Sequence, residues 1–185
     1  MKKLAAVLCV LFLVGCSGKR GELDRAMILR ADLLGSLGYS FDAEITADYG
    51  DKLHTFAMHC TGDNDGNIEF SVTKPETLSG ITGRVSSGDG ELTFDDVALH
   101  FDLLADGQVS PISGPWILVK TLLGGYLTDC VQEEELLHLQ IDDSYEDDAL
   151  HLDIWLNGEN LPVQAEICYD SRRIVTMAVS NFAIL

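Results

Sequence analysis

The chain has 185 residues, with 30 acidic against 12 basic side chains, and its formal net charge is −18. So negative a charge argues against binding to nucleic acid and against electrostatic binding to an anionic membrane surface. The length is sufficient for one domain with a sizeable hydrophobic core.

Residues 1–15 have the layout of an export signal. Met1-Lys2-Lys3 is a short basic segment, and Leu4 to Val14 form an apolar run. This run is shorter than the roughly 20 residues that a transmembrane helix needs. We therefore expect a cleaved signal rather than a permanent membrane span.

The signal ends in Leu13-Val14-Gly15-Cys16, which resembles the bacterial lipobox. The resemblance implies diacylglyceryl transfer to the Cys16 thiol, cleavage before Cys16 and acylation of the new amino terminus. Two or more acyl chains hold a protein stably at a membrane, whereas one binds only marginally. The alternative is a plain signal peptide with a chance cysteine. We expect a lipid anchor at Cys16 on the extracytoplasmic face of the cell membrane, a flexible tether over 16–21 and a single domain over 22–185.

Three further cysteines, Cys60, Cys130 and Cys168, follow in the mature chain. An odd number permits at most one intramolecular disulfide, and none of the three has a CxxC or metal-ligand spacing. We interpret all three as small hydrophobic residues in strands or at the ends of elements.

Residues 22–37 predict an amphipathic helix that Gly38 ends. Its apolar positions approximate a period of 3.6. The main ones are Leu23, Met27, Leu34 and Leu37, with Ala26, Ala31 and Leu33 nearby. Beyond Gly38 the period changes to two, because apolar and polar residues alternate in YSFDAEITADYG. This alternation is typical of an antiparallel strand with one face in water.

A series of strands separated by turn residues follows. KLHTFAMHC and IEFSVTKP flank TGDNDGN, in which we expect a hairpin turn with Gly66 at positive φ. Because the strands follow one another without the spacing of βαβ units, they predict a large antiparallel meander. The further strands are expected at 81–87, 90–95, 97–104, 131–141, 149–157, 161–169 and 172–184.

Residues 110–129 interrupt the meander with a helical pattern. Pro115 suits the first turn of a helix, and Gly124-Gly125 suits its end. Between them only Lys120 and Thr121 are polar, and a helix that is apolar on nearly all sides is normally buried. The pattern predicts a sheet with one apolar face and two helices available to cover it.

The sequence resembles the bacterial LolA-like lipoproteins, a family of lipoprotein carriers, glycolipid-binding lipoproteins and germination lipoproteins. The matching features are Lys74-Pro75-Glu76, Gly80-Ile81-Thr82-Gly83, Leu92-Thr93-Phe94-Asp95 and the Ser110-Pro111 that opens the insert. The order of helix, meander, insert helix and final meander extends the likeness over residues 22–185. The resemblance implies an α+β, mainly antiparallel β fold: an incomplete half-barrel of one curved sheet, with helices covering the concave face.

Two functions follow from this resemblance. The family's carriers hold acyl chains in the concave face, which implies a lipid, a lipoprotein acyl chain or a partner's apolar segment as ligand. Alternatively, the insert helix fills that face permanently, and the protein interacts with a cell-envelope protein through its outer surface, as the germination members are thought to do for a cell-wall amidase. The candidate concave-face residues are Phe41, Ile45, Phe70, Val72, Leu99, Phe101, Trp116, Leu122, Leu152 and Ile154.

Catalytic and metal-binding patterns are weak. The glycine of DNDGN falls one residue early for a calcium loop, and no glutamate follows at the twelfth position. The histidines are scattered, and the acidic runs read as solvated charge. There is no Ser-His-Asp order, P-loop or GxSxG motif. We therefore expect a non-enzymatic protein with no catalytic residue, no metal, no cofactor and no nucleic-acid partner.

The lipobox gives the first prediction. Cys16→Ala removes the thiol that lipid transfer needs, so the variant should leave the membrane fraction and retain its uncleaved signal. Fractionation of cells, with the mass of the purified chain, measures both effects. A variant that stayed membrane-bound and normally cleaved would show that Cys16 is not the anchor.

Overall fold

The structure is a computed structural model that describes residues 18–50, 52–86, 89–95, 97–102, 104–105, 108–147 and 149–185. The signal segment and Cys16 lie outside these residues. The helical elements are α2 (Gly18–Gly35), η1 (Glu76–Leu78), η2 (Pro111–Ser113) and α3 (Gly114–Gly124). The strands are β1 (Tyr39–Asp48), β2 (Leu53–Gly62), β3 (Ile68–Lys74), β4 (Thr82–Ser86), β5 (Asp89–Phe94), β6 (Val97–Asp102), β7 (Leu104–Ala105), β8 (Gln108–Val109), β9 (Tyr126–Glu133), β10 (Leu136–Asp142), β11 (His151–Leu156), β12 (Pro162–Tyr169) and β13 (Arg172–Ile184).

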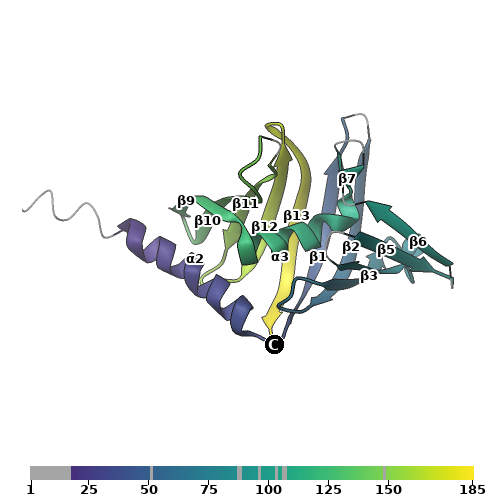
Figure 1. The fold of residues 1–185 in the computed structure, drawn as a ribbon, viewed down its shortest axis with the longest axis horizontal. Helices are drawn as coiled ribbons and strands as arrows, with labels where there is room; N and C mark the ends of the chain where they lie inside the picture. The colour runs from purple at the N-terminus through teal and green to yellow at the C-terminus, as the bar shows by residue number, and fades with distance from the viewer. Residues whose placement is uncertain are drawn as a thin grey trace, which may run out of the picture.

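Eleven of these strands form one antiparallel sheet in the order β6-β5-β4-β3-β2-β1-β13-β12-β11-β10-β9. The chain enters the sheet at its centre, in β1, and meanders outward to one edge at β6. It then crosses to the opposite edge at β9 and meanders back to β13, which pairs with β1. The crossing segment contains α3, which lies over one face of the curved sheet (Figure 1).

The core lies on the face of the sheet that α3 covers. Along β1 the apolar residues Tyr39, Phe41, Ala43, Ile45 and Ala47 are each at most 1% exposed, while their neighbours contact water. Burial of a large apolar side chain stabilises the fold by about 1.5–3 kcal/mol. The period-two pattern predicted after Gly38 is therefore the pattern of core residues in the structure.

α2 differs from its prediction at both ends and in the side that it buries. It ends at Gly35, three residues before the predicted stop at Gly38. It begins at Gly18, so the expected tether over 16–21 overlaps the helix. It also buries Ala26 and Leu33, which were predicted beside its apolar positions, together with Leu29, whereas the main residues predicted for its apolar face are exposed. Those exposed residues are Leu23, Met27, Leu34 and Leu37.

Arg25 orients α2 against the end of the sheet. Its guanidinium donates from Nε to the Asn160 side-chain oxygen at 2.7 Å and from Nη1 to Gln132 at 2.7 Å. Nη2 donates to the main-chain oxygen of Asn157 at 3.0 Å. These bonds join the helix to β9 and to the turn between β11 and β12. No described helix has the length and apolarity needed to cross a membrane.

Two turns show where local sequence signals succeed and fail. Gly66 has φ 85°, as predicted for the DNDGN turn. The prediction of one strand over 131–141 is wrong, because β9 ends at Glu133 and β10 begins at Leu136. Glu134 makes this turn with φ 51°, a conformation that glycine or asparagine usually provides, so the sequence carries no ordinary turn signal here.

Aromatic rings on the core face lie against glycines of the neighbouring strand. Tyr39 is the register partner of Gly62, Phe70 of Gly83, and Phe101 of Gly90. A Cβ added at any of these glycines would collide with the facing ring. The glycines thus let the rings lie flat across adjacent strands, a known means of supporting glycine in a sheet.

This packing gives a prediction for Gly83. A Cβ at this position would meet the Phe70 ring and would lie 2.7 Å from the main-chain oxygen of Glu91, so backbone must shift. We expect Gly83→Ala to lower the free energy of unfolding by about 1–3 kcal/mol, as overpacking does. Gly158→Ala is the matched control, since nothing lies within 4 Å of its added Cβ. Denaturant unfolding measures both, and equal stabilities would contradict the packing argument.

Candidate functional site

The apolar face changes from closed to open along a single row of register partners. The row runs outward from β1 to β6 through Phe41, Cys60, Phe70, Gly83, Leu92 and Leu99. Phe41 and Cys60 are fully buried and Phe70 nearly so, whereas Leu99 in β6 is 63% exposed. The same face is therefore core at the centre of the sheet and accessible surface at its β6 edge.

α3 is the element that closes the centre. All but three of its residues are buried, and Leu118 and Val119 are at most 1% exposed. The ring centroid of the buried Trp116 lies 5.0 Å from the ammonium nitrogen of the exposed Lys120. A cation at this distance from an indole is attracted by the ring's electrons. The insert helix thus fills the half-barrel and exposes the charge of Lys120.

Arg30 of α2 fixes the far end of α3. It donates from Nε to the main-chain oxygen of Leu122 at 2.7 Å and from Nη2 to that of Gly125 at 2.9 Å. The last carbonyls of a helix have no partner within the helix and carry partial negative charge, so a guanidinium satisfies both needs. Burial lowers the pKa of Arg30 from its ordinary value.

Two polar atoms inside this packing have no hydrogen-bond partner in the described structure. They are the indole nitrogen Nε1 of Trp116 and the hydroxyl Oγ1 of Thr121. A buried polar group without a partner costs about 1–3 kcal/mol. The fit of α3 to the sheet is therefore less favourable than its apolar contacts alone would make it.

An uncovered apolar surface remains at the β6 edge. Phe94, Val97 and Leu99 lie on the core-side face and are 53%, 60% and 63% exposed. We call these three residues the edge patch. Single exposed apolar residues are ordinary, but neighbouring ones on two paired strands form a contiguous surface that can bind a partner or a ligand.

The predicted concave-face residues divide between closed core and open edge. Leu99 belongs to the edge patch, and Phe101 is partly buried beside it. The others are buried: Phe41, Ile45, Phe70, Val72, Trp116, Leu122, Leu152 and Ile154. Phe94 and Val97 were not predicted as concave-face residues, although the alternation along their strands places both on the same face of the sheet as Leu99.

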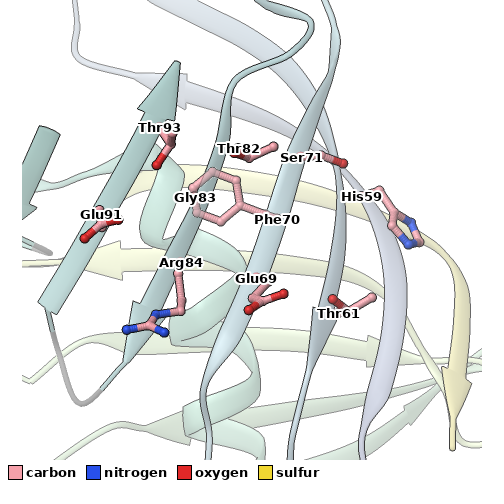
Figure 2. A pocket seen from close by; sticks show the side chains of 10 residues that line it. All are labelled: His59, Thr61, Glu69, Phe70, Ser71, Thr82, Gly83, Arg84, Glu91 and Thr93. Atoms are coloured by element: carbon pink, nitrogen blue, oxygen red, sulfur yellow. The ribbon is translucent and has the colours of Figure 1, made fainter. Parts of the chain in front are cut away.

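The opposite, polar face is hollowed over β2 to β5 (Figure 2). This open hollow of about 520 Å³ is lined mainly by hydroxyl and charged side chains. Arg84 of β4 is one of the lining residues, with Glu69 and Glu91 as register partners on either side. This hollow can therefore offer hydrogen bonds and negative charge to a polar group, but it has no apolar interior for an acyl chain.

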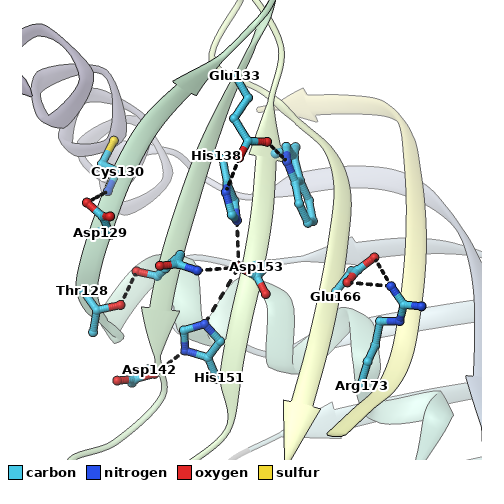
Figure 3. A network of polar contacts seen from close by, with 12 residues as sticks. Thr128, Asp129, Cys130, Glu133, His138, Asp142, His151, Asp153, Glu166 and Arg173 are labelled. Atoms are coloured by element: carbon cyan, nitrogen blue, oxygen red, sulfur yellow. Dashed lines mark hydrogen bonds and ion pairs between the residues drawn. The ribbon is translucent and has the colours of Figure 1, made fainter. Parts of the chain in front are cut away.

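A polar network lies on the same face over β10 and β11 (Figure 3). His138 contacts Asp153 through Nε2 at 2.7 Å and Glu133 through Nδ1 at 3.1 Å. His151 lies 2.7 Å from Asp142 through Nδ1 and 3.8 Å from Asp153 through Nε2. Two of the five histidines, which look scattered in the sequence, thus converge on Asp153, the register partner of Gln140.

Trp155 completes the network. Its ring is stacked on that of His138 with centroids 4.5 Å apart, and its Nε1 donates to Glu133 at 3.0 Å. This hydrogen bond, followed by that of His138, holds the pKa of Glu133 below its ordinary value. Both nitrogens of His138 are engaged by carboxylates, an arrangement that orients the ring. In the described part of the chain, no group of His, Cys, Asp and Glu has the geometry to hold a metal ion.

The three cysteines within the described residues, Cys60, Cys130 and Cys168, are free thiols, and Cys60 and Cys130 are buried. Burial raises the pKa of the Cys130 thiol to about 11, with Glu22 adding to the shift. Burial likewise raises the pKa of Cys60 and, with Asp153, that of Cys168. Cys168 is the register partner of His151, yet a thiol held protonated is a poor nucleophile.

No protein-family model matches the chain, and no curated protein matches it. Solved structures do match in fold. A domain described as an outer membrane lipoprotein-sorting protein from Vibrio parahaemolyticus is 9% identical, with a TM-score of 0.50 over 90% of this chain and 93% of that one. A LolA superfamily protein from Nitrosomonas europaea is 10% identical, with a TM-score of 0.44 over 86% and 93% of the two chains.

The lipoprotein LppX from Mycobacterium tuberculosis is 12% identical, with a TM-score of 0.41 over 88% of this chain and 93% of that one. At such identities the likeness concerns the fold alone. The single open sheet of eleven strands, with α2 and α3 as its described helices, is the LolA-like incomplete barrel. The fold class predicted from the sequence is confirmed.

Proposed function

We propose that the protein is a non-enzymatic, extracytoplasmic lipoprotein, anchored to the cell membrane through Cys16, that binds an apolar segment of a cell-envelope protein at the edge patch. One observation carries the proposal: α3 closes the centre of the apolar face, while the edge patch on the same face is exposed. The lipobox-like segment and the description of the Vibrio neighbour as a lipoprotein-sorting protein support an envelope location.

Binding at the edge patch is favoured over carriage inside the barrel. An acyl chain in the half-barrel would need the space that Leu118, Val119 and Leu122 of α3 occupy, and these are at most 3% exposed. The edge patch needs no rearrangement to receive a ligand. The protein is therefore closer to the interaction lipoprotein with a filled interior than to a carrier.

Acyl-chain binding beneath α3 remains a second candidate because of the unpartnered atoms Trp116 Nε1 and Thr121 Oγ1. A ligand that displaced α3 would release both groups to water and recover part of their cost. The two candidates differ in a measurable way, since only the second requires α3 to move.

Crosslinking at the edge patch tests the main proposal. We expect a photo-crosslinking residue at Leu99, in cells that make the protein, to form a discrete adduct with one envelope protein. Val97→Asp should abolish the adduct without unfolding the chain, because Val97 is exposed and surface substitutions usually change stability by less than about 0.5 kcal/mol.

The matched control is the same crosslinker at Leu53, which is 66% exposed and lies outside the edge patch. It should not form this adduct. Equal adducts at both positions, or adducts at Leu99 with lipid alone, would contradict binding of a protein segment.

Thermal and denaturant unfolding test whether α3 is a fixed plug. In that case Trp116→Ala should cost about 3–5 kcal/mol, as buried aromatic deletions do. Thr121→Val should stabilise the chain, since it removes a buried hydroxyl that has no partner. Leu37→Ala is the stability control, because Leu37 is 90% exposed.

The same measurement with a long-chain fatty acid tests the second candidate. A ligand at a hundred times its dissociation constant stabilises the folded state by about 2.7 kcal/mol. For a fixed plug we expect no shift with the fatty acid. A shift of that size, with a mild Trp116→Ala penalty, would instead establish acyl-chain binding beneath α3.

A further inference from the structure

The two edges of the sheet differ in their protection. An open edge strand presents unpaired N–H and C=O groups, and proteins normally protect it with a cover, a bulge, charges or proline. At one edge, β9 is covered by α2, its pairing with β10 contains a bulge at Gln140–Ile141, and it carries Asp129 and Glu133. That edge is closed to further strands.

β6, at the other edge, has no described cover, no bulge and no proline, and its one acidic residue, Asp102, lies at its end. Its sequence, VALHFD, contains neither lysine nor proline, and its register with β5 is regular from Val97 to Asp102. In the described residues no strand pairs with its outer side. β6 therefore offers a regular row of main-chain donors and acceptors to an added strand.

The two faces beside this edge differ in chemistry. On the core side lies the edge patch, and its residues Val97 and Leu99 alternate along β6 with Ala98 and His100 of the polar face. On the polar side Glu91 lies 3.9 Å from the exposed imidazole of His100, and Asp89 is exposed on the same strand. A strand added here would have one set of side chains over an apolar surface and the other set near carboxylates.

We propose that the partner's segment binds as an additional strand on β6, with apolar side chains over the edge patch and basic side chains on the polar face. This inference rests on the proposed function and names the partner's chemistry: an extended segment in which apolar and basic residues alternate. Main-chain hydrogen bonds to an open edge supply affinity, and the alternating side chains supply specificity. The net charge of −18 favours a basic partner over an acidic one.

Charge and hydrogen bonding also argue against two other occupants of the β6 edge, a second copy of this chain and an acyl chain. A second copy of this chain would bring two strongly negative molecules together at Glu91 and Asp89. An acyl chain would use the apolar surface but leave the main-chain groups of β6 unpaired. A basic amphipathic strand would cover the apolar surface, form hydrogen bonds with the main-chain groups of β6 and place positive charge near the carboxylates.

Synthetic peptides test the inference with the purified full-length lipoprotein in detergent micelles. The probe alternates lysine and valine over seven residues, and the control has the same composition with lysines and valines in separate blocks. We expect the alternating peptide to bind at least about ten-fold more tightly, and to protect the amides of Val97–Asp102 from hydrogen exchange. Leu99→Asp should remove this preference.

Backbone methylation of the probe separates strand addition from simple apolar contact. In an extended peptide, the N–H groups of successive residues point to opposite edges. A peptide methylated on every lysine amide, or on every valine amide, therefore keeps one edge that can donate hydrogen bonds. One of these should bind like the parent, and a peptide methylated on both sets should lose binding.

Two results would overturn strand addition. If the fully methylated peptide binds like the parent, contact is apolar only, and the proposed function stands without it. If the protein forms a concentration-dependent dimer that Leu99→Asp abolishes, the occupant of β6 is a second copy. Loss of the protein adduct at Leu99, by contrast, would remove the proposed function itself.

Discussion

The path of the chain between the two edges of the sheet constrains the rest of the structure. Because β6 and β9 are consecutive large-sheet strands at opposite edges, the segment between them must cross a face of the sheet. α3 is apolar on nearly all sides, so the crossing is stable only on the apolar face, where both surfaces lose contact with water. The interior of the half-barrel is filled as a direct consequence of the topology.

The same constraint accounts for the difference between the edges. α3 ends near β9, where Arg30 binds its last carbonyls and ties it to α2, and α2 in turn covers β9. The helical cover is thus concentrated at one end of the sheet. The strands at the other end, β5 and β6, have no described helix over them, and the edge patch on their core-side face remains exposed, while Leu92 and Phe101 are partly buried.

Much of the fold could be predicted because its signals are local. Alternation in β1, the apolar insert around Trp116 and the glycine of the DNDGN turn each depend on a few neighbouring residues. The side of α2 that faces the core was predicted only in part, because the helix contacts residues far along the chain, as Arg25 does with Asn160, 135 residues away. The meeting of His138 and His151 at Asp153, and the exposure of Leu99, depend on strand register and order, which period-two patterns do not specify.

The position of the anchor bears on which occupant the edge patch can receive. α2 begins at Gly18 at one end of the long axis of the molecule, and β6 lies toward the other end (Figure 1). If lipid is attached at Cys16, just before this helix, the membrane lies beside the start of α2. An acyl chain from the same bilayer would then have to leave the hydrocarbon and pass along the protein, exposing its length to water at about 0.8 kcal/mol for each CH₂ group. A protein segment meets no such cost, and for this reason the geometry favours a protein partner at β6 over a membrane lipid.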